Sequence, residues 1–276
     1  ANPTPSTAPT TQTNILTIEH LIEALPTNDH HIKTLIQQLP DQWSGTNATG
    51  TPITKRQLIQ GSWGELKETD SLQSFQQAII TSLPPPTTNV TQYHTQLASA
   101  ICMDSSVWQH TIRNACQDQI LPHPLSQPIT IFNIHHNSHF TTLITNNQAY
   151  YYYDPLNLHP PQAIDNIHNT LRQWYRGREI APPLLRNKTP NTHIQSTPQQ
   201  TDGWTCGLHM LLINLATIYQ GRIPTLMHTQ QHAEELSRSH LKYILTGELD
   251  TTINNLIYTL TTTPQAASRT PSRRTR

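Results

Sequence analysis

The chain has 276 residues, with 17 Lys and Arg against 17 Asp and Glu, and only three cysteines. This length allows one sizeable domain with an accessory region. So few, unevenly spaced cysteines exclude a disulfide framework and a Cys-x-x-Cys zinc site, and favour a reducing, intracellular setting. No apolar run is long enough to cross a membrane, and the balanced charge argues against nucleic-acid binding by the body of the chain.

Composition divides the chain into four parts. Residues 1–14, rich in Pro and Thr, are expected to be a disordered lead-in, and residues 261–276, which contain four Arg, a disordered basic tail. Residues 15–89 carry apolar residues at helical spacing and are predicted to form a helical N-terminal region. It ends in a Pro-rich stretch that marks the start of a domain at residues 90–260. For the tail, a solvated linker is favoured over a nucleic-acid-binding segment.

The domain at 90–260 combines strands and helices. Three segments rich in β-branched and aromatic residues indicate strands at 129–134, 139–145 and 148–154. A short fourth strand is predicted at 192–195. Helices are predicted at 93–103, 105–121, 164–177, 206–221 and 228–247. We therefore expect an α/β (α+β) fold in which a mixed central sheet is flanked by helices. Cys102 and Cys116 are expected to be small buried hydrophobes on apolar helix faces.

A hairpin brings together a histidine and an aspartate. If Asn146 and Asn147 form a two-residue turn, His139 faces Asp154 across the two strands, with Cβ atoms about 5 Å apart. A carboxylate held against one imidazole nitrogen orients the ring, so the other nitrogen can take a proton from a nucleophile. The alternative is a cross-strand pair on a solvated face. The pattern therefore predicts two parts of a catalytic triad and needs a third.

Cys206 supplies the third part, because it precedes a helix that is apolar on nearly every side. The N-terminal end of a helix favours a thiolate. Gly207 leaves the backbone open to a substrate carbonyl, and Asp202 and Gly203 form the turn that leads into the helix. Gln200 offers an amide donor for an oxyanion, which contributes on the order of 100-fold in rate. The sequence predicts that Cys206 is a nucleophile, with another buried thiol as the alternative.

The order His, Asp, Gln, Cys and the segments "HFTTLI", "YYYYDPLN" and "PQQTDGWTCG" resemble the SUMO and ubiquitin-like-protein protease family and its relative, the adenovirus endopeptidase. The resemblance covers residues 129–245. It implies an adenain-like cysteine proteinase fold, with His139 as the base and Asp154 as its orienting partner. It further implies Gln200 as the oxyanion-hole residue and Cys206 as the nucleophile.

Three positions depart from the family pattern. Phe140 stands where these proteases usually carry a Trp that covers the extended Gly-Gly end of the modifier. Thr205 replaces the frequent Asp before the cysteine, and Trp204 is bulky beside it. Phe140, Trp204 and Gly207 are the predicted substrate-binding residues. The departures predict that the chemistry is kept while the specificity is changed.

The segment "HHNSH" holds His135, His136 and His139, which could suggest a metal site. No acidic residue completes a helical His/Glu motif, and the segment is predicted to be a loop that enters a strand. We therefore expect no metal and no cofactor.

These observations predict a cysteine peptidase that hydrolyses peptide or isopeptide bonds in a protein substrate. Two substrate classes remain: a ubiquitin-like modifier, as in deconjugation or processing, and the chain's own polyprotein, as in a virus or mobile element. An acyltransferase on the same fold is a further alternative, because some bacterial effectors that resemble these proteases acetylate hydroxyl groups. A non-catalytic binding module that retains the fold is the alternative from a different class.

Overall fold

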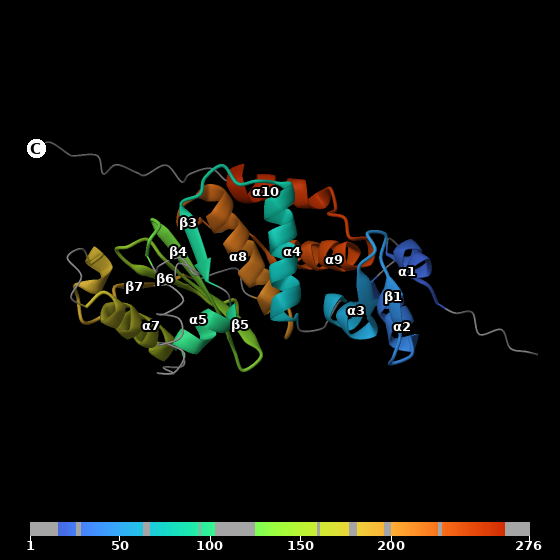
Figure 1. The fold of residues 1–276 in the computed structure, drawn as a ribbon, viewed down its shortest axis with the longest axis horizontal. Coiled ribbons are helices and arrows are strands. Elements are labelled where there is room, and N and C mark those ends of the chain that lie inside the picture. Colours follow the sequence, from blue (N-terminus) through green and yellow to red (C-terminus); the bar gives the residue numbers. More distant parts are fainter. Residues whose placement is uncertain are drawn as a thin grey trace, which may run out of the picture.

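The computed structural model describes residues 16–25, 29–62, 67–93, 95–102, 125–158, 161–176, 181–195, 200–225 and 228–262. Its centre is a five-stranded sheet in the order β3-β4-β5-β6-β7 (Figure 1). The central strand β5 is antiparallel to both of its neighbours, β4 and β6, whereas the edge strands β3 and β7 pair in parallel with β4 and β6. The predicted mixed sheet is confirmed. The strands are β3 (Val90–Tyr93), β4 (Ile129–His136), β5 (His139–Thr145), β6 (Tyr150–Tyr153) and β7 (Thr192–Gln195).

Helices cover both faces of this sheet (Figure 1). One face packs against α8, which is backed by α4 and α10, and the other is covered by α5 and α7. α8 is buried from its first residue to its last turn, which explains why its sequence is apolar on nearly every side. These helices are α4 (Thr69–Ser82), α5 (Thr95–Cys102), α7 (Pro161–Trp174), α8 (Cys206–Gln220) and α10 (Thr252–Thr262).

Alternating side chains on β5 serve the two faces. Phe140 and Ile144 belong to the core around α8, whereas Leu143 belongs to the core beneath α5 and α7. Because successive side chains of a strand point to opposite faces, His139 has the parity of Leu143. It also begins the strand, so its ring lies at the end of the sheet where both faces meet solvent.

The hairpin between β4 and β5 has a two-residue turn. Asn137 and Ser138 have φ angles of 49° and 59°, and His136 pairs with His139. Two successive residues with positive φ are typical of a type I′ turn, whose twist suits a hairpin. The predicted loop over "HHNSH" is therefore too long, since His135 and His136 belong to β4.

The hairpin between β5 and β6 has a longer turn than predicted. Thr145 pairs with Tyr150, two positions further along than a two-residue turn would place its partner. The reason is Asn146, whose Oδ1 accepts hydrogen bonds from the N–H groups of Gln148 and Ala149, so the turn extends over 146–149. The prediction that His139 and Asp154 face each other directly is wrong. A shift of two residues nevertheless keeps them on the same face as diagonal neighbours.

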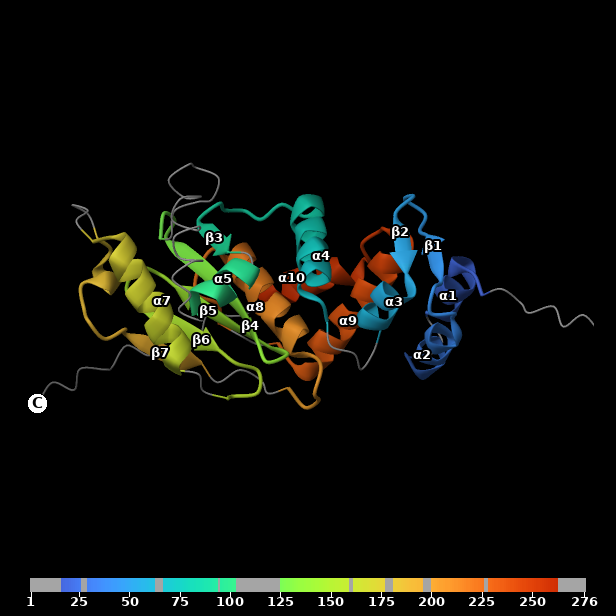
Figure 2. The ribbon, with the colours of Figure 1, turned by 60° about the horizontal axis from the view of Figure 1, so that its bottom comes forward.

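The N-terminal helices pack at the other end of the molecule, against α9 (Figure 2). They share a separate core with α9, whereas α4 joins the core of α8. The helical prediction for this region is confirmed in the main, but a two-stranded ribbon within it was not predicted. The elements are α1 (Ile18–Ala24), α2 (Asp29–Gln38), β1 (Ser44–Thr46), β2 (Pro52–Thr54), α3 (Lys55–Gly61) and α9 (Gln230–Thr246).

The later helices begin and end close to their predicted bounds. α8 and α9 end at Gly221 and Gly247, whose φ angles of 61° and 76° are left-handed, as expected at a helix C-terminus. α7 and β7 are also where they were predicted, whereas β3 and α10 were not predicted. The predicted helix at 105–121, the lead-in, Cys116 and the Arg residues of the tail lie outside the described residues.

Within the described ranges, no helix has both the length and the apolar character that crossing a bilayer requires.

We expect Phe75→Ala on α4 to lower the free energy of unfolding by about 3–5 kcal/mol. Phe75 is fully buried and its ring stacks on His240, with centroids 4.9 Å apart. Urea denaturation measures the loss. Tyr258→Ala on α10 is the control, because Tyr258 is 68% exposed and should change stability by no more than about 0.5 kcal/mol. Equal effects of the two variants would contradict the placement of α4 in the α8 core.

Candidate active site

Cys206 is the first residue of α8, and it is buried. The helix starts here because the carbonyl of Thr205 accepts the N–H groups of Leu208 and His209. The thiol therefore lies at the positive end of a 15-residue helix, where free backbone N–H groups and the helix dipole stabilise a negative charge.

His139 links Asp154 to Cys206. Its Nε2 lies 2.8 Å from Asp154 Oδ1, and the Cys206 side chain is close enough to its ring to help raise the pKa of the imidazole. Because Nε2 is engaged by the carboxylate, Nδ1 is the nitrogen available to the thiol. Asp154 follows β6 directly, and its Oδ1 also accepts the N–H of Leu156 at 2.9 Å. The structure thus brings together three of the four predicted catalytic residues, His139, Asp154 and Cys206.

The electrostatics favour a protonated imidazole. Burial by itself lowers the pKa of His139, but the hydrogen bonds and the charges of Asp154 and Cys206 outweigh it and raise the pKa to about 9. An imidazolium and a thiolate stabilise each other when they lie side by side. The imidazole of His139 is therefore protonated near neutral pH and lies beside the thiol of Cys206.

Gln200 is buried beside this pair. Its backbone N–H donates to the carbonyl of Pro155 at 2.9 Å, which ties the loop before α8 to the residue after Asp154. Its Nε2 donates to the backbone carbonyl of Asp202 at 2.7 Å and lies 3.2 Å from Asp202 Oδ1. The amide is thus oriented by Asp202. Its donation to an oxyanion stays a prediction.

Asp202 organises the loop that precedes Cys206. The sequence predicted only that Asp202 and Gly203 form a turn. Its Oδ1 accepts from the N–H groups of Trp204 and Thr205, both at 2.9 Å, and from the Thr205 hydroxyl at 2.8 Å. Burial raises the pKa of this carboxyl, but these hydrogen bonds outweigh burial and lower it. An Asp shortly before a helix is a recognisable capping signal that could have identified this role.

Gln230, at the start of α9, fixes Asp202 from behind. Its Nε2 donates to Asp202 Oδ2 at 2.7 Å, and its Oε1 lies 3.2 Å from Nε2 of His209. His209 is fully buried one turn after Cys206, and burial lowers its pKa, so the ring is neutral and able to donate. The chain His209–Gln230–Asp202 therefore braces the loop against two helices. No local sequence signal identifies Gln230, because the contact joins residues far apart in the chain.

Comparison with solved structures finds this fold in SUMO proteases. The C-terminal Ulp1 protease domain in complex with SMT3, the yeast orthologue of SUMO, matches with a TM-score of 0.53 and 15% identity, over 79% of this chain and 93% of that one. Ulp1 with its catalytic cysteine oxidised to a sulfonic acid gives 0.54 and 15%, over 80% and 97%. The Ulp1-like SUMO protease catalytic domain of Chaetomium thermophilum gives 0.53 and 12%, over 87% and 93%.

The chain has the fold of these protease domains. This confirms the predicted fold class. No model of a known protein family matches the sequence, and no curated protein does.

Gly207 has a packing role that the sequence did not predict. A Cβ at this position would lie 2.7 Å from Leu72 Cδ1 of α4 and 3.2 Å from Phe140 Cδ2. A side chain here would require Leu72 and the Phe140 ring to shift, so glycine permits the observed close approach. The position therefore lets α4 and β5 pack against the first turn of α8, and its predicted opening toward a substrate carbonyl stays a prediction.

The other two predicted substrate-binding residues differ in exposure. Phe140 is 1% exposed, and its ring stacks on His135 with centroids 4.1 Å apart. Its ring is thus part of the core that packs against α8. Trp204 is half-buried in the loop before Cys206, with the Lys67 ammonium 5.1 Å from the centre of its ring. Substrate contact by either side chain stays a prediction.

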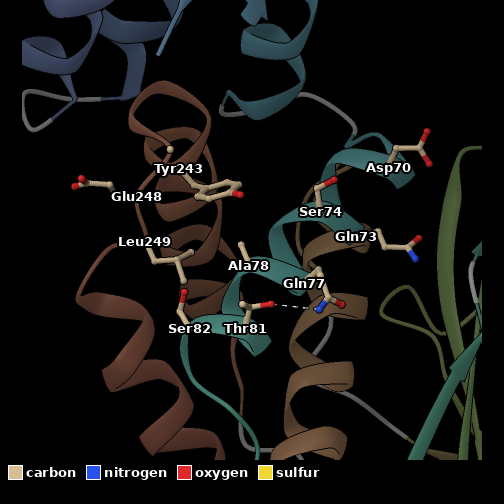
Figure 3. Close-up of a pocket in the computed structure, with 11 residues that line it drawn as sticks. Asp70, Gln73, Ser74, Gln77, Ala78, Thr81, Ser82, Tyr243, Glu248 and Leu249 are labelled. Carbon is tan, nitrogen blue, oxygen red and sulfur yellow. Dashed lines mark hydrogen bonds between the residues drawn. The ribbon is translucent and has the colours of Figure 1, made fainter. Parts of the chain in front are cut away.

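A hollow of about 960 Å³ between α4 and the end of α9 lies apart from this site (Figure 3). Its walls include Ser74, Gln77, Tyr243 and Leu249, and none of the predicted catalytic residues. For metals, the described residues contain no group of three or more His, Cys, Asp or Glu that could hold an ion.

We expect Asp154→Asn to lower the pKa of His139 from about 9 toward its ordinary value, because the hydrogen bond and charge of the carboxylate are lost while burial and Cys206 still act. NMR titration of the imidazole measures this shift. The raised pKa means that the imidazolium stabilises the fold fully below about pH 6.5, and that this contribution is lost as the pH rises through about 9. Asp70→Asn, at an exposed position on α4, should leave the titration unchanged. An unchanged midpoint in Asp154→Asn would contradict the pairing.

We expect Gln230→Ala to lower the free energy of unfolding by about 1.5–3 kcal/mol, the range for a hydrogen bond to a charged group. The variant leaves one oxygen of Asp202 without its donor. The neighbouring Gln231→Ala is a matched control. Gln231 is exposed, and its side chain donates a hydrogen bond to Glu235 of the same helix. Urea denaturation measures the free energy of unfolding of both variants. Equal losses in Gln230→Ala and Gln231→Ala would exclude a bracing role for Gln230.

Proposed function

We propose that the chain is a cysteine peptidase that hydrolyses peptide or isopeptide bonds, of the ubiquitin-like-protein protease type. The observation that carries the proposal is the position of His139 between Asp154 and Cys206, at the N-terminus of a buried helix. The shared fold with Ulp1, a protease with a catalytic cysteine, supports it.

In this mechanism the Cys206 thiolate attacks the scissile carbonyl, and the backbone N–H groups at the start of α8 hold the oxyanion, joined by the Gln200 amide once a substrate displaces it from Asp202. The C–N bond then breaks, and the His139 imidazolium protonates the leaving amine. A water molecule, deprotonated by the neutral His139, hydrolyses the thioester and restores the thiol.

The substrate is proposed to be a ubiquitin-like modifier or a precursor protein. Ulp1 has been solved in complex with the SUMO orthologue SMT3, which supports the first. The replacement of the expected Trp by a buried Phe140 favours a different extended segment and supports the second.

We expect an electrophilic peptide or modifier probe to label Cys206, Cys206→Ala to abolish labelling, and His139→Ala to slow it by a factor of about 100 or more. Intact-mass spectrometry across probes based on ubiquitin, SUMO and related modifiers measures it. Cys102→Ala is the control for labelling of a different thiol and should leave the labelling of Cys206 unchanged. Equal labelling of His139→Ala and the unaltered chain would exclude the mechanism, and cleavage of the chain's own flanking sequences alone would identify a processing enzyme.

A further inference from the structure

Lys67 is a buried cation that lies between the N-terminal region and the loop before Cys206. It precedes α4 in the chain and is only 4% exposed. A lysine is almost never this deeply buried unless specific partners hold its charge, because moving an ammonium out of water is costly. The partners of Lys67 therefore show which parts of the chain its charge joins.

The first partner of the ammonium is the end of α3. Lys67 Nζ donates to the backbone carbonyl of Ser62 at 2.7 Å, and Ser62 is the residue that follows α3. Ser62 is itself fixed, since its N–H and its hydroxyl both donate to the carbonyl of Ile59 in that helix. The cation is thus anchored to a helix of the N-terminal region.

The second partner is the indole ring of Trp204. Lys67 Nζ lies 5.1 Å from the centre of this ring, within the distance of about 6 Å at which a cation is attracted to an aromatic face. Among aromatic side chains, Trp attracts cations most strongly. One ammonium therefore contacts both the end of α3 and a residue that lies two positions before Cys206.

Helix α9 also lies close to this cation. Burial and the charge of Lys67 lower the pKa of His240 to about 3, so the imidazole of His240 is neutral. Its Nε2 lies 2.9 Å from Ser71 Oγ of α4. The charge of Lys67 thus acts at a point where α3, α9 and the loop before Cys206 come together.

The hydrogen bonds of Asp202 fix the backbone of this loop rather than the ring of Trp204. Asp202 Oδ1 accepts the main-chain N–H groups of Trp204 and Thr205. The indole itself is half-buried and packs beside the core of α8. The cation at its face therefore adds a directional contact that Asp202 does not supply.

The position of Trp204 bears on the chemistry because the loop carries the reacting groups. Trp204 is joined through Thr205 to Cys206, and Gln200 precedes it in the same loop. A misplacement of about 1 Å, even from a change far from the reacting atoms, can lower a rate about 100-fold. A contact that fixes the ring thereby helps to fix the nucleophile.

We propose that Lys67 is a positioning residue for Cys206, which it holds in place through the ring of Trp204. The consequence for catalysis rests on the proposed peptidase function. Ser62 and Lys67 both belong to the N-terminal region, so the inference also gives that region a role. The helices before the sheet are part of the catalytic unit.

The test is a double-mutant cycle on the rate at which an electrophilic peptide probe labels Cys206 in the full chain. We expect Lys67→Met, which removes the charge from an unbranched side chain, to slow labelling by a factor of about 2–30, the range that corresponds to a cation–π contact. Lys67→Arg keeps a cation at the ring and should label within about twofold of the unaltered chain. The loss from Lys67→Met should disappear in the background of Trp204→Leu, because coupled residues are not additive.

The matched control is Lys55→Met. Lys55 belongs to the same region but pairs with Asp41 at 2.9 Å, so this variant should leave the labelling rate unchanged. Fluorine NMR of the chain labelled with fluorotryptophan gives a readout that needs no activity, and Trp204→Tyr assigns the Trp204 signal by its loss. We expect Lys67→Met to shift this signal and Lys67→Arg to keep it closer to its original position.

A second pair of variants covers the case in which urea denaturation shows that Lys67→Met does not fold. Trp204→Leu and Trp204→Tyr test the same contact from the side of the loop. Tyr keeps an aromatic face for the cation, so Trp204→Tyr should label faster than Trp204→Leu. Equal labelling of these two variants would overturn the positioning role of Lys67.

Different outcomes separate this inference from the proposed function. Labelling of Lys67→Met at the rate of the unaltered chain would overturn the positioning role, as would equal losses with and without the Trp204 ring. An unaltered chain that the peptide probes do not label would overturn the peptidase function, and the fluorine signal would then decide the role of Lys67 by itself. A Trp204 signal that does not move in Lys67→Met overturns the contact in either case.

Discussion

The contact of one imidazole with both a carboxylate and a thiol is the constraint on which the rest of this structure depends. His139 begins β5, Asp154 follows β6 and Cys206 begins α8. The start of β5, the end of β6 and the start of α8 must therefore lie close together, at one end of the strands. A slip of one residue in β5 would turn His139 to the opposite face and place Phe140 in its position. The hairpin turn at 137–138 and the pairing of β5 with β6 therefore fix the position of His139 as well as the fold.

A charged pair at a buried site is stable only if its surroundings supply compensating hydrogen bonds. Here the compensation extends beyond the pair. Asp154 accepts a backbone N–H in addition to the imidazole, and Asp202 accepts several donors from the loop and one from Gln230. These contacts place the loop without using the thiol itself. Cys206 is thereby held in position by neighbours that take no part in proton transfer.

The parts of this protein that follow from the sequence are those encoded locally. Periodicity located α7, α8 and α9, and Gly221 and Gly247 located the ends of α8 and α9, because helices depend on contacts within a few residues. The same-face relation of His139 and Asp154 survived a wrong turn length, because a register shift of two preserves the face. The turn length itself was missed because Asn146 bonds the backbone with its side chain. Gln230 and the Gly207 packing were missed because they join residues that are distant in the chain.

Helix α4 of the N-terminal region packs against the residue that follows Cys206. Leu72 of α4 and Phe140 of β5 both press against Gly207, so a helix from before the sheet forms part of the floor beneath the nucleophile. A larger ring at position 140 would have to displace Leu72 or the first turn of α8, because protein cores are close-packed. Phe140 and α4 are therefore coupled through their shared contact with Gly207, and a larger ring at position 140 would require Leu72 of α4 to shift. The packing around Cys206 thus depends on a helix of the N-terminal region as well as on the sheet.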